Sequence, residues 1–190
     1  MSVIDFNSFI FLVRNQIVDK TIKINNLKIS FLCNKKIDID NDSCLSYFKG
    51  YNLLVKFDKF TYTFLGKTKN HVNITGIKSF LEIEAAIKGI LVFSNLNLEN
   101  FKNFNIDNIS ASFVTHPGLK EIILNTTNSD FTFFRPVKFC GIIIKYKKCS
   151  STYFNSGKCI IVGLKSISDL NLYVSKIRFF FDKCTEKFEI

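Results

Sequence analysis

The sequence contains no tryptophan, one methionine, two prolines and two histidines among its 190 residues. With only His71 and His116, it has too few histidines for the common forms of acid–base catalysis. It also lacks a phosphate-binding loop of the Gly-x-x-x-x-Gly-Lys type and a Gly-x-Ser-x-Gly nucleophile elbow. These absences argue against an enzyme, so we expect no catalytic residue.

Paired cysteines are also absent, because the six cysteines include no Cys-x-x-Cys motif. They are Cys33, Cys44, Cys140, Cys149, Cys159 and Cys184. Zinc sites usually draw their ligands from such pairs and from nearby histidines. We therefore expect no metal and no other cofactor, and we interpret the cysteines as free, mostly buried thiols in a reducing compartment.

No hydrophobic run is long enough to cross a bilayer. The apolar stretch Phe9–Val13 lies between Asp5 and Arg14, which makes it too short for a membrane span, and no small-residue cleavage site follows it. We interpret residues 1–21 as an N-terminal extension that packs on the protein, and we expect no membrane partner.

Basic residues and phenylalanine are abundant. Lysine and arginine number 26 against 16 acidic residues, a net charge of +10, which favours a polyanionic partner through counterion release. Charge alone leaves nucleic acid, an anionic membrane surface and an acidic protein open. The 22 phenylalanines, with frequent isoleucine, asparagine and lysine, are typical of A·T-rich codons and hint at a viral or protist genome.

Two pairs of similar segments recur in the same order along the chain. Ile24–Phe31 is similar to Ile106–Phe113, and Ile74–Ser79 is similar to Ile161–Ser166. Because two landmarks keep their order and nearly their separation, we interpret the chain as a duplicated unit.

Each repeat closes with an amphipathic helix. Ser79 and Glu82 form a Ser-x-x-Glu capping pattern before the first helix, and apolar residues at helical spacing follow Ser166 before the second. Short β-like stretches lie between the landmarks. The predicted fold class is α+β: lobe 1 (22–98) and lobe 2 (102–190) share one continuous domain, a curved antiparallel sheet with helices on its convex face. The other face is left for a large partner.

The segment Phe154–Lys165, FNSGKCIIVGLK, resembles the TATA-binding protein family, whose repeats carry Phe-x-Ser-Gly-Lys, an apolar strand and Thr-Gly-Ala-Lys. Phe139–Ile143 is similar to the family's Phe-Pro-Gly-Leu-Ile, and Phe104–Ile109 to its Phe-Lys-Ile-Gln-Asn-Ile. The likeness covers nearly all of residues 22–190 and is clearest in lobe 2. It implies a saddle of two pseudo-symmetric lobes.

The resemblance further implies that the open face binds the minor groove of DNA and that a pair of phenylalanines from each lobe is wedged between base steps. In lobe 2 it assigns this role to Phe139 and Phe154. In lobe 1 it assigns the second wedge to Phe64 and leaves the first open between Phe48 and Tyr51.

Other DNA-binding residues also follow from the resemblance. Asn26 and Asn108 match the family's paired central asparagines, whose amide donors suit the acceptors of A·T pairs. Thr75 retains a family threonine, which Val162 replaces in lobe 2. The lysines expected to neutralise phosphates are Lys56, Lys67, Lys78, Lys145, Lys158 and Lys165.

Some positions depart from the family pattern. Lys28 and Ser110 replace valines that face the bases, and Asn73 replaces another apolar residue. These changes put a strict TATA preference in doubt, and the lobe 1 turn is longer by Thr68–Asn70.

The expected function is a general transcription initiation factor. Such a factor binds and bends A·T-rich promoter DNA, and it recruits TFIIB-like and possibly TFIIA-like factors and, through them, RNA polymerase. The alternative is a protein-interaction module of the same fold that has lost DNA bending. The expected location is the nucleus, or a cytoplasmic viral factory if the source is viral.

Overall fold

The computed structural model describes residues 4–39, 44–126, 128 and 130–188. The helices are α1 (Phe6–Arg14), α2 (Ile83–Phe93), α3 (Lys120–Leu124) and α4 (Ile167–Phe188), with single 3₁₀ turns η1 (Phe80–Glu82) and η2 (Leu98–Asn100). The strands are β1 (Lys23–Cys33), β2 (Leu45–Lys49), β3 (Asn52–Phe57), β4 (Phe60–Leu65), β5 (His71–Ile77), β6 (Phe101–Val114), β7 (Thr132–Phe134), β8 (Gly141–Tyr146), β9 (Cys149–Phe154) and β10 (Lys158–Leu164).

The chain forms two compact units that are interleaved in sequence. Unit 1 comprises Met1–Gln16 and Asn26–Asp107, and unit 2 comprises Ile17–Asn25 and Asn108–Ile190. The predicted lobes followed one another along the chain, whereas these units exchange short segments. The reason is that β1 and β6 are long, and each contributes one end to either unit.

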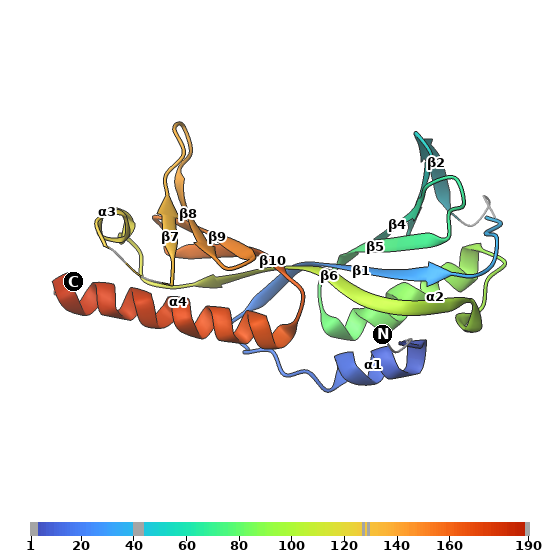
Figure 1. Cartoon of the computed structure of the whole chain (residues 1–190), viewed down its shortest axis with the longest axis horizontal. Helices are drawn as coiled ribbons and strands as arrows, with labels where there is room; N and C mark the ends of the chain where they lie inside the picture. The colour runs from blue at the N-terminus through green and yellow to red at the C-terminus, as the bar shows by residue number, and fades with distance from the viewer. Residues whose placement is uncertain (1–3, 40–43, 127, 129, 189–190) are drawn as a thin grey trace. The chain divides into compact units, whose positions relative to one another are not determined.

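In unit 1 the strands follow the order β2-β3-β4-β5-β1-β6, and α1 and α2 lie on one face of this sheet (Figure 1). Side chains alternate along β4, so Phe60, Tyr62 and Phe64 are buried beneath the helices while the residues between them are half-exposed. The Tyr62 hydroxyl donates to the carbonyl of Ala86 on α2 at 2.8 Å. That bond satisfies a buried polar group at the centre of the core.

In unit 2 the order is β6-β10-β9-β8-β7, with α4 on one face (Figure 1). The helix buries an apolar stripe made of Leu170, Tyr173, Val174, Ile177 and Phe181, as its helical spacing predicted. At the N-terminus of α4, the backbone N–H of Asp169 donates to Ser166 Oγ at 3.1 Å.

The corresponding cap of unit 1 differs from the prediction. Ser79 makes no side-chain capping bond. Instead the carboxylate of Glu82 accepts from the backbone N–H of Lys78 at 2.8 Å and pairs with Lys59. These bonds lower the pKa of Glu82, first through the bond from Lys59 and then through that from Lys78. The turn is therefore held by Glu82, because Ser79 lies before a 3₁₀ turn and not directly before α2.

Helix α1 covers a part of unit 1. It buries Phe6, Phe9, Ile10 and Val13, and the ring of Phe9 stacks on that of Phe104 with centroids 5.3 Å apart. Arg14 at its C-terminal end pairs with Glu84 of α2. The N-terminal apolar run is thus part of the unit 1 core.

The predicted fold class is confirmed: helices and an antiparallel sheet form an α+β protein, and in each unit the long helix lies on one face of the sheet. Within the described ranges, no helix has the length and apolar character required for a membrane span. The same residues contain no cluster of side chains suited to a metal ion.

Burial separates the cysteines into two classes that a thiol reagent should distinguish. Burial raises the pKa of the Cys159 thiol from 9.0 to about 12, whereas Cys140 is exposed. Because the thiolate is the reactive form, such a shift lowers its fraction about a thousandfold. We expect modification of Cys140 in the folded protein at about pH 8 and of Cys159 only after unfolding. Peptide mass spectrometry measures the modification rates of Cys140 and Cys159. Similar rates in the folded protein would contradict the burial of Cys159.

Candidate nucleic-acid interface

Each unit has a sheet face that its own described helices leave uncovered (Figure 1). In unit 1 this open face carries Thr61, Thr63 and Leu65 of β4. In unit 2 it carries Thr152 and Phe154 of β9. These side chains are half-buried, because alternation turns their neighbours into the core. The open faces therefore present both polar and apolar atoms, as the minor groove of DNA requires of a ligand.

The two predicted central asparagines make the same bond in each unit. Asn26 Oδ1 accepts from the backbone N–H of Gly76 at 2.8 Å, and Asn108 Oδ1 accepts from the backbone N–H of Gly163 at 2.8 Å. Both asparagines lie next to fully buried residues, so alternation places them on the open face.

A bulge in the neighbouring strand provides the donor for each bond. The register shifts where β5 passes β1 and where β10 passes β6, and at both places the glycine has a φ of 93°. A side chain at Gly76 would bring its Cβ within 2.6 Å of the carbonyl oxygen of Lys59. Glycine is therefore required here, and its freed N–H turns toward the asparagine.

This bond orients the amide. Because Oδ1 is occupied by a backbone donor, Nδ2 is left as the donor of each side chain. In the part of the chain that the structure describes, Nδ2 of Asn26 and Nδ2 of Asn108 form no hydrogen bond. The site therefore presents one amide donor in each unit at equivalent positions of the repeat.

In unit 2 the structure brings the predicted wedge residues together. The rings of Phe139 and Phe154 meet edge to face, with centroids 6.3 Å apart. Phe139 lies in the loop between β7 and β8, and Phe154 ends β9. Both rings are partly exposed, so they form a single apolar edge beside the open face of unit 2.

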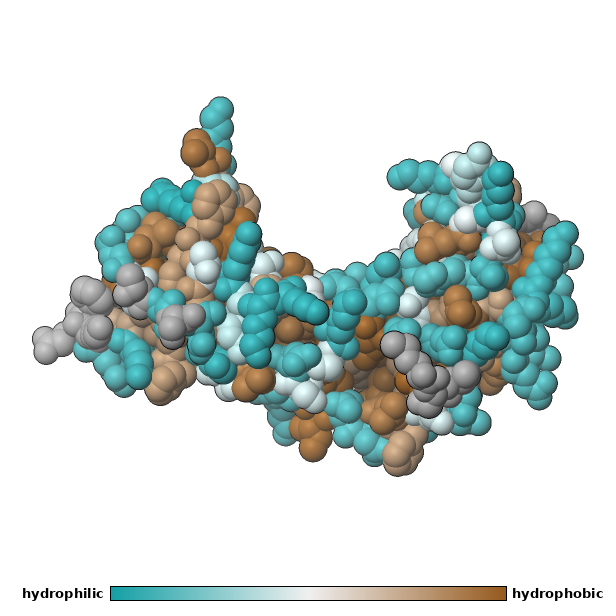
Figure 2. All heavy atoms as spheres, viewed as in Figure 1, coloured by the Kyte–Doolittle hydropathy of each residue, from teal (hydrophilic) through white to brown (hydrophobic). Residues whose placement is uncertain are grey.

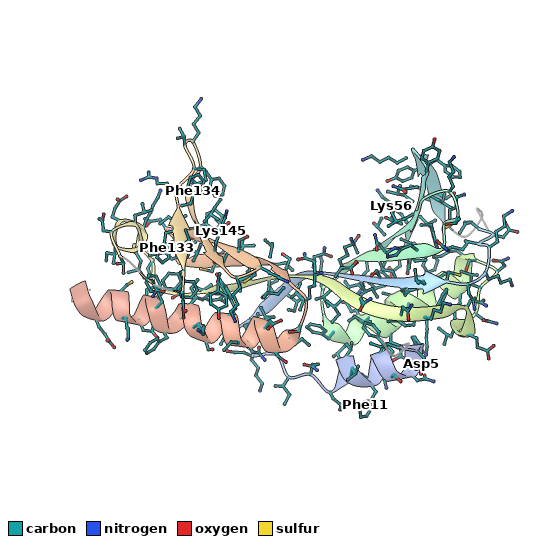
Figure 3. All side chains as sticks on the ribbon, viewed as in Figure 1. Asp5, Phe11, Lys56, Phe133, Phe134 and Lys145 are labelled. Carbon is teal, nitrogen blue, oxygen red and sulfur yellow. The ribbon has the colours of Figure 1, made fainter. Side chains whose placement is uncertain are left out.

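The β7–β8 hairpin adds apolar groups that the sequence did not indicate. Figure 3 shows Phe133 toward α4 and Phe134 on the opposite side of β7. Phe133 stacks on Phe180, whereas Phe134 is exposed. Val137 in the connecting loop is 91% exposed, and apolar atoms lie just below a hydrophilic tip in Figure 2. No periodic pattern marks them, since they lie on a three-residue strand and a loop.

The prediction for Phe64 is wrong. Its side chain is 0% exposed and belongs to the unit 1 core. By strand register it matches the buried Tyr153, and the next residue, Leu65, matches Phe154. Because the turn after β4 is longer than the turn after β9, the sequence match that aligned Phe64 with Phe154 was wrong by one position. A shift of one residue moves a side chain to the other face of a strand. Leu65 is therefore the unit 1 residue at the wedge position.

The two alternatives for the other unit 1 wedge are both exposed, and each carries a cation. Lys69 Nζ lies 4.5 Å from the ring centroid of Phe48, and Lys67 Nζ lies 5.2 Å from that of Tyr51. Such cation–π contacts place positive charge beside an apolar ring. The insertion in the lobe 1 turn provides Lys69.

The remaining predicted residues lie around the open faces. Thr75 and Val162 immediately precede the two bulge glycines, and Val162 is exposed. Lys56 and Lys145 occupy equivalent positions on β3 and β8 (Figure 3). The predicted lysines are all exposed: Lys56, Lys67, Lys78, Lys145, Lys158 and Lys165. Charge of this kind suits contact with phosphate oxygens.

Comparison with known proteins identifies relatives of this arrangement. The family model described as transcription factor TFIID, or TATA-binding protein, matches residues 103–184. The TATA-box-binding protein of Methanocaldococcus jannaschii is 27% identical over 177 residues, which cover 85% of this chain and 94% of that protein. A solved structure of Methanococcus jannaschii TBP superposes with a TM-score of 0.66 at 26% identity, over 87% of this chain and 98% of that one.

The turn that positions Phe154 depends on Gly157, which has a φ of 84°. A Cβ there would lie 2.3 Å from the carbonyl oxygen of Thr115. Gly118 also has a positive φ but has open space around it, so Gly118→Ala is a matched control. We expect Gly157→Ala to lower the free energy of unfolding by about 1 to 3 kcal/mol more than Gly118→Ala. Urea denaturation measures the free energy of unfolding of both variants. Equal losses of stability in the two variants would contradict the requirement for glycine at position 157.

Proposed function

The chain is a divergent member of the TATA-binding protein family, and on that premise we propose that it binds A·T-rich promoter DNA through the minor groove and bends it. The family consists of non-enzymatic transcription initiation factors. The observation that carries the proposal is the paired bond of Asn26 to Gly76 and of Asn108 to Gly163. In each unit this bond holds the asparagine oxygen and leaves the Nδ2 donor free to contact a ligand on the open face.

Amide donors suit A·T pairs. In the minor groove A·T and T·A both present only acceptors, adenine N3 and thymine O2. An asparagine whose oxygen is held by a backbone N–H offers its NH₂ to either pair equally. A pair of such donors therefore favours A·T over G·C without reading the order of the strands.

The aromatic edges supply the bending. An apolar side chain inserted between base steps unstacks them and kinks the duplex, and the cost is offset by the additional surface that a bent duplex contacts. Phe139 and Phe154 form such an edge in unit 2. In unit 1 we assign the role to Leu65 with Phe48 or Tyr51, whose lysines would lie close to phosphates.

The same protein would connect DNA to the transcription machinery. We propose that it recruits TFIIB-like and TFIIA-like factors, and RNA polymerase through them. The helices on the covered face support this, because α4 leaves Leu172 and Phe179 exposed. The site of action follows from the function: the nucleus, or a cytoplasmic viral factory for a viral source.

Replacing the asparagines by aspartate tests the outward amide donor without removing the oxygen that bonds to the glycine. Asn26→Asp and Asn108→Asp keep an oxygen for the glycine N–H but replace the outward donor by an acceptor. We expect each change to weaken binding to an A·T-rich duplex by about 1 to 3 kcal/mol, measured by fluorescence anisotropy at one salt concentration.

Asn95→Asp is the matched control. Asn95 is exposed, and its Oδ1 also accepts a backbone N–H, that of Asp38 at 3.0 Å. It therefore makes the same chemical change and adds the same charge outside the open face. Equal affinities for Asn26→Asp, Asn108→Asp and Asn95→Asp would refute the role of the central pair.

The wedge assignment predicts a change in DNA shape. Replacing both Phe139 and Phe154 by alanine should remove the kink on the unit 2 side. Energy transfer between the ends of a labelled A·T-rich duplex should then fall toward the value of free DNA. Phe179→Ala, which removes a ring that is 61% exposed on α4, should leave the transfer unchanged.

Two results would count against bending. Energy transfer that the double substitution does not alter would show that these rings are not wedges. Binding of the unmodified protein with no transfer above that of free DNA would favour the interaction module that has lost DNA bending.

A further inference from the structure

A row of polar side chains crosses the open face of unit 1. Thr63 on β4 is paired with Asn73 on β5, and Asn73 is paired with Ser30 on β1. Ser30 Oγ then donates to Asp107 Oδ1 on β6 at 2.9 Å. Directly paired residues of antiparallel strands share a face, so Thr63, Asn73 and Ser30 lie on the same face as the predicted DNA contacts. The carboxylate of Asp107 reaches this face, because it contacts both Ser30 and Lys28.

The equivalent row of unit 2 has a different chemistry. Thr152 is paired with Ile160, and Ile160 with Ser112. Ser112 Oγ then donates to Asn25 Oδ1 at 3.1 Å. The repeat conserves both serine bonds, but unit 2 has isoleucine where unit 1 has Asn73, and an amide where unit 1 has the carboxylate of Asp107.

Asp107 keeps capacity to accept another hydrogen bond. One oxygen accepts from Ser30, and the other lies 3.6 Å from Lys28 Nζ. The side chain is 31% exposed, and a carboxylate has about four acceptor sites. The Oδ1 atom of Asn73, two strands away, is buried without a hydrogen-bond partner within the described residues, so a ligand cannot reach it. Unit 1 therefore presents the carboxylate oxygens of Asp107 to whatever covers this face.

Oxygen acceptors do not match an A·T minor groove. Such a groove is lined by acceptors, which a carboxylate repels, whereas a G·C pair adds one donor, the exocyclic N2 amino group of guanine. A carboxylate held on the open face matches that donor. At the equivalent position unit 2 has Asn25, whose oxygen already accepts from Ser112 and whose Nδ2 is a donor that cannot bond to the guanine amino group.

We infer that Asp107, held in place by Ser30, accepts a hydrogen bond from a guanine amino group, so that the DNA element is A·T-rich but carries a G·C pair in the half contacted by unit 1. This inference rests on the proposed function and specifies its target. It also makes binding directional, because the half contacted by unit 2 lacks the matching acceptor.

The test compares guanine with inosine. In a series of A·T-rich duplexes, each A·T pair is replaced in turn by G·C or by I·C, which lacks only the N2 amino group. For the unmodified protein we expect G·C to bind at least about fivefold more tightly than I·C at a position in one half of the site. At the other positions G·C should bind more weakly than I·C.

Asp107→Ala should remove this preference. If Asp107 served only to neutralise Lys28, the substitution would change the affinity for every duplex alike and leave the ratio of G·C to I·C unaltered, a result that overturns the inference. Absence of any position that prefers G·C in the unmodified protein also overturns it.

A reciprocal variant transfers the site to unit 2. Asn25→Asp with Ser110→Lys places a carboxylate beside Ser112 and a lysine at the position equivalent to Lys28. We expect a second position that prefers G·C, in the other half of the duplex; its absence would contradict the role of the carboxylate.

The two proposals fail differently. A protein that binds no A·T-rich duplex at low salt refutes the proposed function and the inference with it. Binding and bending of A·T-rich duplexes without any preference for G·C over I·C refutes the inference alone.

Discussion

The bond from a bulge glycine to an asparagine oxygen is the constraint on which the candidate interface depends. It occurs once in each unit, at 2.8 Å in both. The bulge turns a backbone N–H out of the ladder, and the asparagine satisfies that donor, since an unpaired N–H at this place would be costly. The same bond fixes which end of the amide faces outward. Fold stability and the proposed recognition of DNA therefore depend on the same interaction.

The two copies of the repeat keep this constraint and differ around it. Both keep the serine that bonds to the neighbouring strand, Ser30 and Ser112. Near them, unit 1 has Lys28, Asn73 and Asp107, whereas unit 2 has an isoleucine and an amide at two of these positions. A duplicated fold presents related faces, but its recognition depends on residues that differ between the copies.

The exposed aromatic residues of the two units also differ, although the strands that carry them are equivalent. In unit 2 two phenylalanines meet at 6.3 Å, and a glycine turn holds one of them in place. In unit 1 the longer turn puts a leucine at the equivalent position and brings lysines over Phe48 and Tyr51. Two phenylalanine rings thus meet in unit 2, whereas in unit 1 the exposed rings are each covered by a lysine.

The sequence by itself determined the duplication, the α+β class, the buried stripe of the C-terminal helix, the matched asparagines and the Phe139–Phe154 pair. The first three depend on local periodicity and on repeated segments, which a single chain displays directly. The asparagines and the phenylalanine pair followed from the resemblance to the TATA-binding protein family. Strand register and contacts between distant residues were decided only by the tertiary structure. Register makes Leu65, and not Phe64, the unit 1 equivalent of Phe154, because a shift of one residue reverses the face on which a side chain lies. It also brought Asp107 beside Ser30 and Lys28, a contact between strands about which local sequence carries no signal.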